Sequence, residues 1–104
     1  MFHLLYASLA QLRPDHEDTA IADIVRVSQD RNKEAGVTGA LLHTGAHFAQ
    51  WLEGDEAAVR AIMASISTDA RHRDVTILQQ GPRDRRSFAS WSVASCGRST
   101  FAAA

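Results

Sequence analysis

The sequence has one cysteine, two prolines and no long hydrophobic run, and these shortages exclude several classes of protein. Cys96 has no second cysteine to pair with, which excludes an internal disulfide and fits a reducing cytosol. No apolar stretch approaches the roughly 20 residues that span a bilayer. Residues 1–6 lack the basic segment and the long apolar core of a signal peptide. We therefore expect a cytoplasmic protein without a membrane partner.

An excess of charge of either sign is also missing. The 104 residues carry 11 Lys and Arg against 12 Asp and Glu. This balance gives no electrostatic basis for a nucleic-acid partner. His43 and His47 flank a predicted hairpin turn rather than sharing a helix face, so they do not indicate a metal site. Hydrophobic residues make up 45% of the chain, which is typical of one globular domain with a modest core.

The spacing of apolar residues predicts five strands and two helices. Alternation and short apolar runs predict strands, whereas spacings of three and four predict helices. Asp15 and Asp55 are placed to cap the two helices, and Gly36 is placed to end the first. The expected strands are 3–8, 37–44, 47–53, 74–80 and 88–96, and the expected helices are 17–35 and 56–69.

Taken in order, these elements predict a βαββαββ chain. Each helix follows a strand and must cross back over the same face of a mixed sheet. The predicted fold class is α+β, a ferredoxin-like sandwich with a five-stranded mixed sheet and two helices on one face. Such a fold leaves a groove between the helices, above the central strands.

Gln50 is the most informative polar residue. Strand alternation places its side chain on the same face as those of Phe48 and Leu52, which are core residues. A primary amide has two N–H groups and two acceptor lone pairs to satisfy. Leaving a buried group of this kind unpaired costs roughly 1–3 kcal/mol. Another side chain, the backbone or a ligand must therefore meet Gln50.

Further polar residues are expected in the same layer between sheet and helices. Tyr6 lies on the first strand, and Asn32 continues the apolar stripe of the first helix. Asp69 stands three residues beyond Ile66 and so extends the stripe of the second helix. A planar heterocycle with carbonyls and ring nitrogens would satisfy several of these groups at once. The residues alone predict a ligand site and leave the heterocycle unidentified.

Six short segments carry a combined pattern that is far more specific than any one of them. The segments are Leu-Tyr-Ala-Ser at 5–8, Ser-Gln-Asp-Arg-Asn at 28–32, Gly-Val-Thr-Gly-Ala-Leu-Leu at 36–42, Phe-Ala-Gln-Trp-Leu-Glu-Gly at 48–54, Asp-Ala-Arg-His at 69–72 and Arg-Ser-Phe-Ala-Ser-Trp-Ser at 86–92. The combined pattern resembles the BLUF family, the blue-light sensors that use FAD, and it extends over about residues 3–96 in the family order.

The resemblance implies that FAD lies between the two helices with its ring end-on to the sheet. Asn32 would then bond the pyrimidine edge of the flavin, and Gln50 would bridge the Tyr6 hydroxyl and the N5/O4 edge. Arg31 would meet a flavin carbonyl or a phosphate. The other cofactor-binding residues implied are Ile24, Ser28, Phe48 and Leu52 near the ring, and Asp69, Arg71 and His72 along the ribityl and ring side.

The implied mechanism is photochemical, so no enzymatic turnover is expected. Blue light would draw an electron from Tyr6, and a proton would follow through Gln50. The amide would be left rotated or tautomerised, with a small red shift in absorption, because reorienting it exchanges donor and acceptor. The last strand, with Trp91, would pass the change to a downstream partner that the sequence does not identify.

Two residues depart from the family pattern. Val93 stands where relatives usually have methionine, and Ser65 stands where many have arginine or histidine. These departures keep open a flavin-free ferredoxin-like interaction module. An acylphosphatase-like small hydrolase also stays open, but no spacing supports its need for Arg13 beside Asn32, and no Gly-rich phosphate loop occurs.

The end of the chain bears on its organisation. We expect residues 1–98 to form the BLUF domain and 99–104 a short tail. Relatives commonly continue into an effector domain or two C-terminal helices, so we expect either a truncated chain or output wholly by association. Exposed apolar sheet surface would favour a homodimer.

Overall fold

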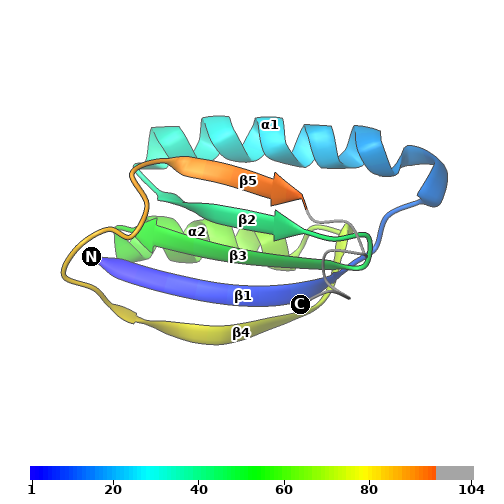
Figure 1. The fold of residues 1–104 in the computed structure, drawn as a ribbon. Helices are drawn as coiled ribbons and strands as arrows, with labels where there is room; N and C mark the ends of the chain where they lie inside the picture. Colours follow the sequence, from blue (N-terminus) through cyan, green and yellow to red (C-terminus); the bar gives the residue numbers. More distant parts are fainter. Residues whose placement is uncertain (96–104) are drawn as a thin grey trace, which may run out of the picture.

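A computed structural model describes residues 1–95, and its elements follow the predicted order (Figure 1). Within these residues the α+β prediction is confirmed, with a five-stranded mixed sheet and two helices on one face. Cys96 and the expected tail 99–104 lie outside the described residues. The elements are β1 (Phe2–Ala10), a 3-10 turn (Pro14–His16), α1 (Glu17–Ala35), β2 (Thr38–His43), β3 (His47–Gly54), α2 (Glu56–Ser67), β4 (His72–Pro82) and β5 (Trp91–Ser95).

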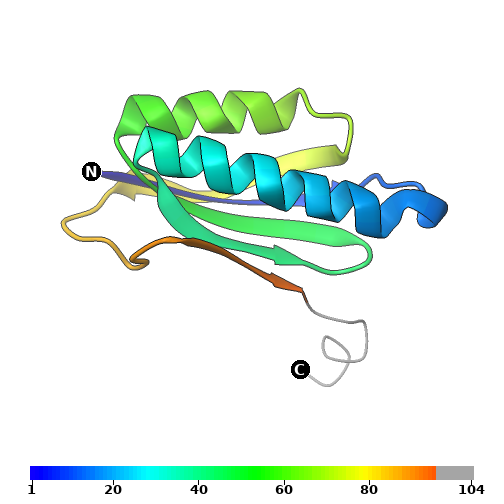
Figure 2. The same cartoon turned by 90° about the horizontal axis from the view of Figure 1, so that it is seen from above.

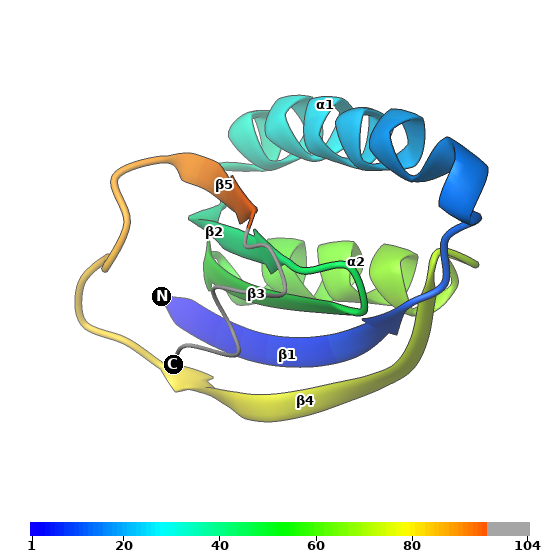
Figure 3. The ribbon, with the colours of Figure 1, turned by 45° about the vertical axis from the view of Figure 1, so that its right-hand side comes forward.

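The strands lie in the order β4-β1-β3-β2-β5, and only the β2–β5 pair is parallel. Figure 2 shows α1 and α2 side by side on one face of this sheet. Because β4 and β5 are opposite edge strands, the connection between them must cross one end of the sheet. Figure 3 shows this connection, residues 83–90, running past the N-terminus to β5. Neither helix of the described residues is both long and apolar enough to cross a membrane.

The core lies between the sheet and the helices. Alternation along β1 and β3 points one side-chain face of each strand into it, which buries Leu4, Tyr6 and Ser8 of β1 and, as predicted, the face of β3 that carries Gln50. The helix α2 contributes an apolar stripe at spacings of three and four. The stripe consists of Val59, Ile62, Met63 and Ile66.

Two of the three predicted helix boundaries are confirmed. Gly36 ends α1 in the left-handed conformation, with φ of 70° and its N–H directed at the carbonyls of Asn32 and Lys33. The side chain of Asp55 accepts a hydrogen bond from the N–H of Ala58 and so caps α2.

The prediction for Asp15 is wrong. A turn of 3-10 helix precedes α1, so His16 occupies the capping position and makes no side-chain cap. Asp15 instead pairs with the exposed Arg13 and with His16. The helix begins at residue 17 as predicted, and the 3-10 turn leaves Asp15 one position before the cap.

Several strand and helix boundaries also differ from expectation. The helix α2 ends at Ser67, because Thr68 turns its hydroxyl back to the carbonyls of Ala64 and Ser65. The strand β4 is longer than expected, and β5 begins at Trp91 because residues 88–90 belong to the connection.

Two glycines allow a matched test of backbone packing. A Cβ at Gly39 would overlap the carbonyl oxygen of Trp51, whereas a Cβ at Gly36 would meet nothing. We expect Gly39→Ala to lower the free energy of unfolding by about 3 kcal/mol or more. Gly36→Ala carries only the left-handed penalty of about 1–2 kcal/mol. Denaturant unfolding measures both, and equal losses in the two variants would contradict this packing.

Candidate functional site

A chain of hydrogen bonds joins three buried side chains from three strands. The Nε2 of Gln50 donates to the hydroxyl of Tyr6 at 2.7 Å. The Nε1 of Trp91 donates to the Oε1 of Gln50 at 2.8 Å. The three side chains are between 0% and 9% exposed. The predicted partner Tyr6 is therefore in place, and Trp91 is a second partner that the sequence analysis did not assign to Gln50.

The orientation of the Gln50 amide follows from these bonds. An indole N–H can donate but cannot accept, so the oxygen of the amide must face Trp91 and the nitrogen must face Tyr6. Tyr6 is then an acceptor in this bond, and its own proton remains available to another group. The second N–H of Gln50 is likewise available.

The register of the sheet explains how these residues meet. Tyr6 of β1 lies directly opposite Gln50 of β3, and Leu41 of β2 lies opposite Gln50 on the other side. Leu41 in turn pairs with Val93, so Trp91 reaches Gln50 from two residues earlier on β5. A slip of one residue in any pairing would turn one of these side chains to the other face.

Burial sets the protonation of Tyr6. Loss of solvation raises the pKa of this phenol to about 12, against the opposing effects of the Gln50 hydrogen bond and the charge of Arg31. Asp69 acts in the same direction as burial. The phenol therefore keeps its proton at neutral pH.

Asn32 carries a buried polar atom with no partner among the described residues. Its side chain is 0% exposed, and its Oδ1 accepts from the Nε of Arg31 at 3.2 Å. Its Nδ2 has no hydrogen-bond partner. Since an unpaired buried N–H costs about 1–3 kcal/mol, this atom is an unsatisfied donor at the layer between α1 and the sheet. Burial also lowers the pKa of Arg31 from its usual value.

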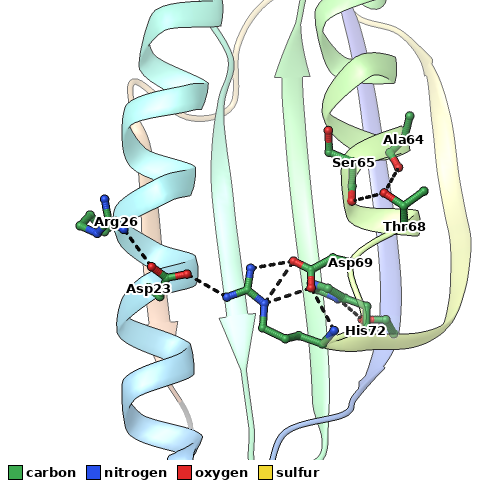
Figure 4. A network of polar contacts seen from close by, with 9 residues as sticks. Asp23, Arg26, Ala64, Ser65, Thr68, Asp69 and His72 are labelled. Atoms are coloured by element: carbon green, nitrogen blue, oxygen red, sulfur yellow. Dashed lines mark hydrogen bonds and ion pairs between the residues drawn. The ribbon is translucent and has the colours of Figure 1, made fainter.

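An ion-pair network links α1 to the segment that follows α2 (Figure 4). Arg71 donates to Asp69 at 2.7 Å and to Asp23 of α1 at 3.1 Å. The hydrogen bond from Arg71 is the main reason that the pKa of Asp69 is lowered. The prediction that Asp69 extends the stripe of α2 is therefore wrong. The helix ends before Asp69, and the carboxylate of Asp69 pairs with Arg71.

His72 begins β4 beside the same three-residue chain. Its Nδ1 bonds the hydroxyl of Ser8 at 2.8 Å, and its ring lies 4.6 Å from that of Phe48 and 6.1 Å from that of Tyr6. Burial lowers the pKa of the imidazole, which favours a neutral ring at neutral pH. Ser8 was not predicted as a site residue, although its place on the inner face of the first strand was an available signal.

A cavity of about 130 Å³ collects most of the predicted site residues. Asn32, Phe48 and Leu52 are buried but do not line it, and Trp91 lines a separate surface hollow. Ser65, flagged as a departure, does line it. The cavity lining consists of Tyr6, Ile24, Val27, Ser28, Arg31, Leu41, Gln50, Ser65, Ile66, Asp69, Arg71 and His72, of which Val27, Leu41 and Ile66 were not predicted.

The fold and this cavity define a ferredoxin-like domain with a ligand pocket that combines amide, phenol and charged groups. The family described as "Sensors of blue-light using FAD" matches residues 1–94. The chain therefore belongs to the BLUF family.

Individual relatives agree with this assignment. The chain is 32% identical over 90 residues to the photoactivated adenylate cyclase subunit beta of Euglena gracilis, an alignment that covers 86% of this chain and 10% of that protein. It is 39% identical over 75 residues to the blue light- and temperature-regulated antirepressor BluF of Escherichia coli K12, covering 72% of this chain and 18% of BluF. The chain thus spans only a small part of either relative.

A solved structure is also similar. The dark-state structure of BlrB, a BLUF protein, matches with a TM-score of 0.84 and 34% identity. The match covers 98% of this chain and 76% of BlrB.

Tyr6 is the one tyrosine of the chain, so its titration can be observed alone. We expect the ultraviolet absorbance of the folded protein to report a pKa near 12, against an ordinary value of 10.0. Because the folded state holds the phenolic proton more tightly than the unfolded state does, protonated Tyr6 contributes to the free energy of unfolding. This contribution is complete below about pH 10 and is lost as the pH rises toward 12. A midpoint near 10 in protein that circular dichroism shows to be folded would contradict the burial of this phenol.

Proposed function

We propose that this chain is a blue-light photoreceptor domain, formed by residues 1–98, that binds FAD between α1 and α2. The observation that carries the proposal is the oriented Tyr6–Gln50–Trp91 chain, whose first two residues line the cavity. The unpaired Nδ2 of Asn32 supports a ligand with a carbonyl edge. The light-sensing activity rests on an exchange of hydrogen bonds and not on the turnover of a substrate.

The residues present fit a flavin. Asn32 and Arg31 would hold carbonyl oxygens, because the first offers an unpaired N–H and the second a half-buried guanidinium. Ile24 and Ser28 would contact the ring from α1. Arg71 and Asp69 would bind the ribityl chain of the cofactor near the end of α2. The ring would contact the sheet through Phe48, Leu52 and His72.

When bound, the flavin would supply a strong oxidant under blue light. Tyr6 would act as the electron donor, and its phenolic proton would follow through Gln50. In the described structure the Nε2 of Gln50 donates to the Tyr6 oxygen, so the amide must turn its oxygen toward the phenol before it can accept that proton. Both the electron and the proton would then return to Tyr6. Gln50 is left reoriented or tautomerised, and this change in the amide is the signal.

The hydrogen bonds of the described structure explain why the lit state would revert to the dark state. If the amide rotates, its oxygen faces the Tyr6 hydroxyl, which can donate to it. Its nitrogen then faces the indole N–H of Trp91, so two donors oppose each other. A buried donor without an acceptor costs about 1–3 kcal/mol, so the lit arrangement is higher in free energy and reverts by itself.

The change would leave the site through β5 to a partner. Val93 is half-buried opposite Leu41 and offers no hydrogen-bonding group, so Trp91 is the residue of β5 that senses the amide. A homodimer would use sheet surface such as Leu78, which is 60% exposed on β4. No observation favours the hydrolase alternative, because Arg13 pairs with Asp15 at the surface whereas Asn32 is fully buried.

Absorption spectroscopy tests the proposal. We expect a yellow protein whose flavin band shifts reversibly to the red under blue light. Gln50→Leu keeps the flavin but loses the reversible shift, because leucine has no amide to reorient. Gln80→Leu, an exposed control on β4, retains it. A protein that stays colourless with added FAD would refute the proposed function, and a normal photocycle in Gln50→Leu would refute the role of the amide.

Asn32 gives a second test, of binding alone. Asn32→Leu removes the unpaired N–H, so we expect the affinity for FAD to fall about tenfold. The flavin-free chain should lose only about 1 kcal/mol of unfolding free energy, since Nδ2 was unsatisfied and Oδ1 made one hydrogen bond, to the half-buried Arg31.

Flavin fluorescence titration and denaturant unfolding provide the two readings for Asn32→Leu. Gln29→Leu is the matched control, because Gln29 is an exposed amide on the same helix and does not line the cavity. Unchanged affinity in Asn32→Leu would contradict this placement of the flavin edge.

A further inference from the structure

Glu53 carries a buried carboxylate that the proposed mechanism does not use. It lies three residues after Gln50 on β3, on the face turned away from the helices, and its side chain is 0% exposed. Burying a carboxylate is unfavourable unless its oxygens are bonded, so its partners show what it is there to hold.

The partners of Glu53 come mainly from the connection between β4 and β5. The N–H of Ser87 donates to both carboxylate oxygens, at 2.9 and 2.7 Å, and the N–H of Phe88 donates to Oε1 at 3.0 Å. The indole of Trp51 adds a longer bond of 3.3 Å. We call the Glu53 carboxylate with these two backbone N–H groups the Glu53 clamp.

Arg86 fixes the same point of the connection from its other side. Its guanidinium donates to the carbonyl of Glu53 at 3.1 Å and to that of Gly36 at 3.0 Å. It also donates to the hydroxyl of Thr38 at 2.7 Å. The connection is thereby tied to the ends of α1, β2 and β3 just before β5 begins.

This attachment decides where Trp91 lies. The strand β5 is an edge strand that pairs only with β2 in the described sheet, and the connection reaches it from the opposite edge (Figure 3). Trp91 is its first residue, four positions after Ser87. A shift of the connection would therefore move the indole away from Gln50.

We propose that Glu53 is a positioning residue that holds Trp91 against Gln50 and thereby sets the lifetime of the lit state. The inference rests on the proposed function for its kinetic part. In the lit state the indole N–H faces the amide nitrogen, and a clamped Trp91 cannot move away from this opposition. The clamp thus raises the free energy of the lit state and favours return. Loosening it lets Trp91 withdraw, so the lit state lasts longer.

Glu53→Gln tests this in the intact chain. The amide keeps the volume of the carboxylate but presents N–H groups toward the N–H donors of the connection. We expect dark recovery to slow by about threefold or more, with an unchanged red shift and flavin content. Nuclear magnetic resonance of the indole N–H of Trp91, in a Trp51→Phe background, should show a shifted signal in the dark. Glu56→Gln, an exposed carboxylate at the start of α2, is the matched control and should change neither reading.

A second variant, Arg86→Ala, keeps the test valid if Glu53→Gln does not fold. Arg86→Ala removes an exposed side chain from the same connection and leaves Glu53 intact, so the same slowing and the same indole shift are expected. Recovery at the wild-type rate with an unmoved indole signal, in either folded variant, would overturn the proposal. If the wild type shows no red shift, the proposed function fails, and the indole signal alone decides whether Glu53 positions Trp91.

Discussion

The hydrogen bond from the indole of Trp91 to Gln50 is the interaction on which the rest of the site depends. Because the indole can only donate, it fixes which end of the amide is oxygen and which is nitrogen. That choice makes Tyr6 an acceptor and leaves its proton available. It also makes any reversal of the amide unfavourable in the dark. An amide whose two ends met identical partners would have the same free energy in both orientations.

The scaffold supplies what this interaction needs. Adjacent central strands bring Tyr6 and Gln50 into direct opposition, and their burial keeps water from competing for the bonds. Trp91 comes from an edge strand whose position depends on a connection that crosses the end of the sheet. Direct pairing of central strands therefore fixes Tyr6 against Gln50, whereas the position of Trp91 depends on the connection that leads to β5.

Much of this arrangement could be predicted from the sequence, because periodicity reports which face is buried. The inner faces of β1 and β3 and the end of α1 at Gly36 followed from local rules. Asp15 was misplaced because the 3-10 turn before α1 puts His16 in the capping position, and Asp69 was misplaced because α2 ends two residues earlier than expected, where Thr68 turns its hydroxyl back. Glu53 received no role, since alternation predicts an outward side chain and only the long-range return of residues 87–88 buries it. The six segments identified the family where no single residue could.

The most direct test of the account follows the Gln50 amide itself in light and darkness. In protein labelled with ¹⁵N-glutamine, the side-chain amide signals that disappear in Gln50→Leu belong to this residue. The account predicts that these signals move under blue light and return in darkness at the rate at which the flavin band returns. A flavin band that shifts and recovers while the Gln50 amide signals stay in place would contradict the central claim.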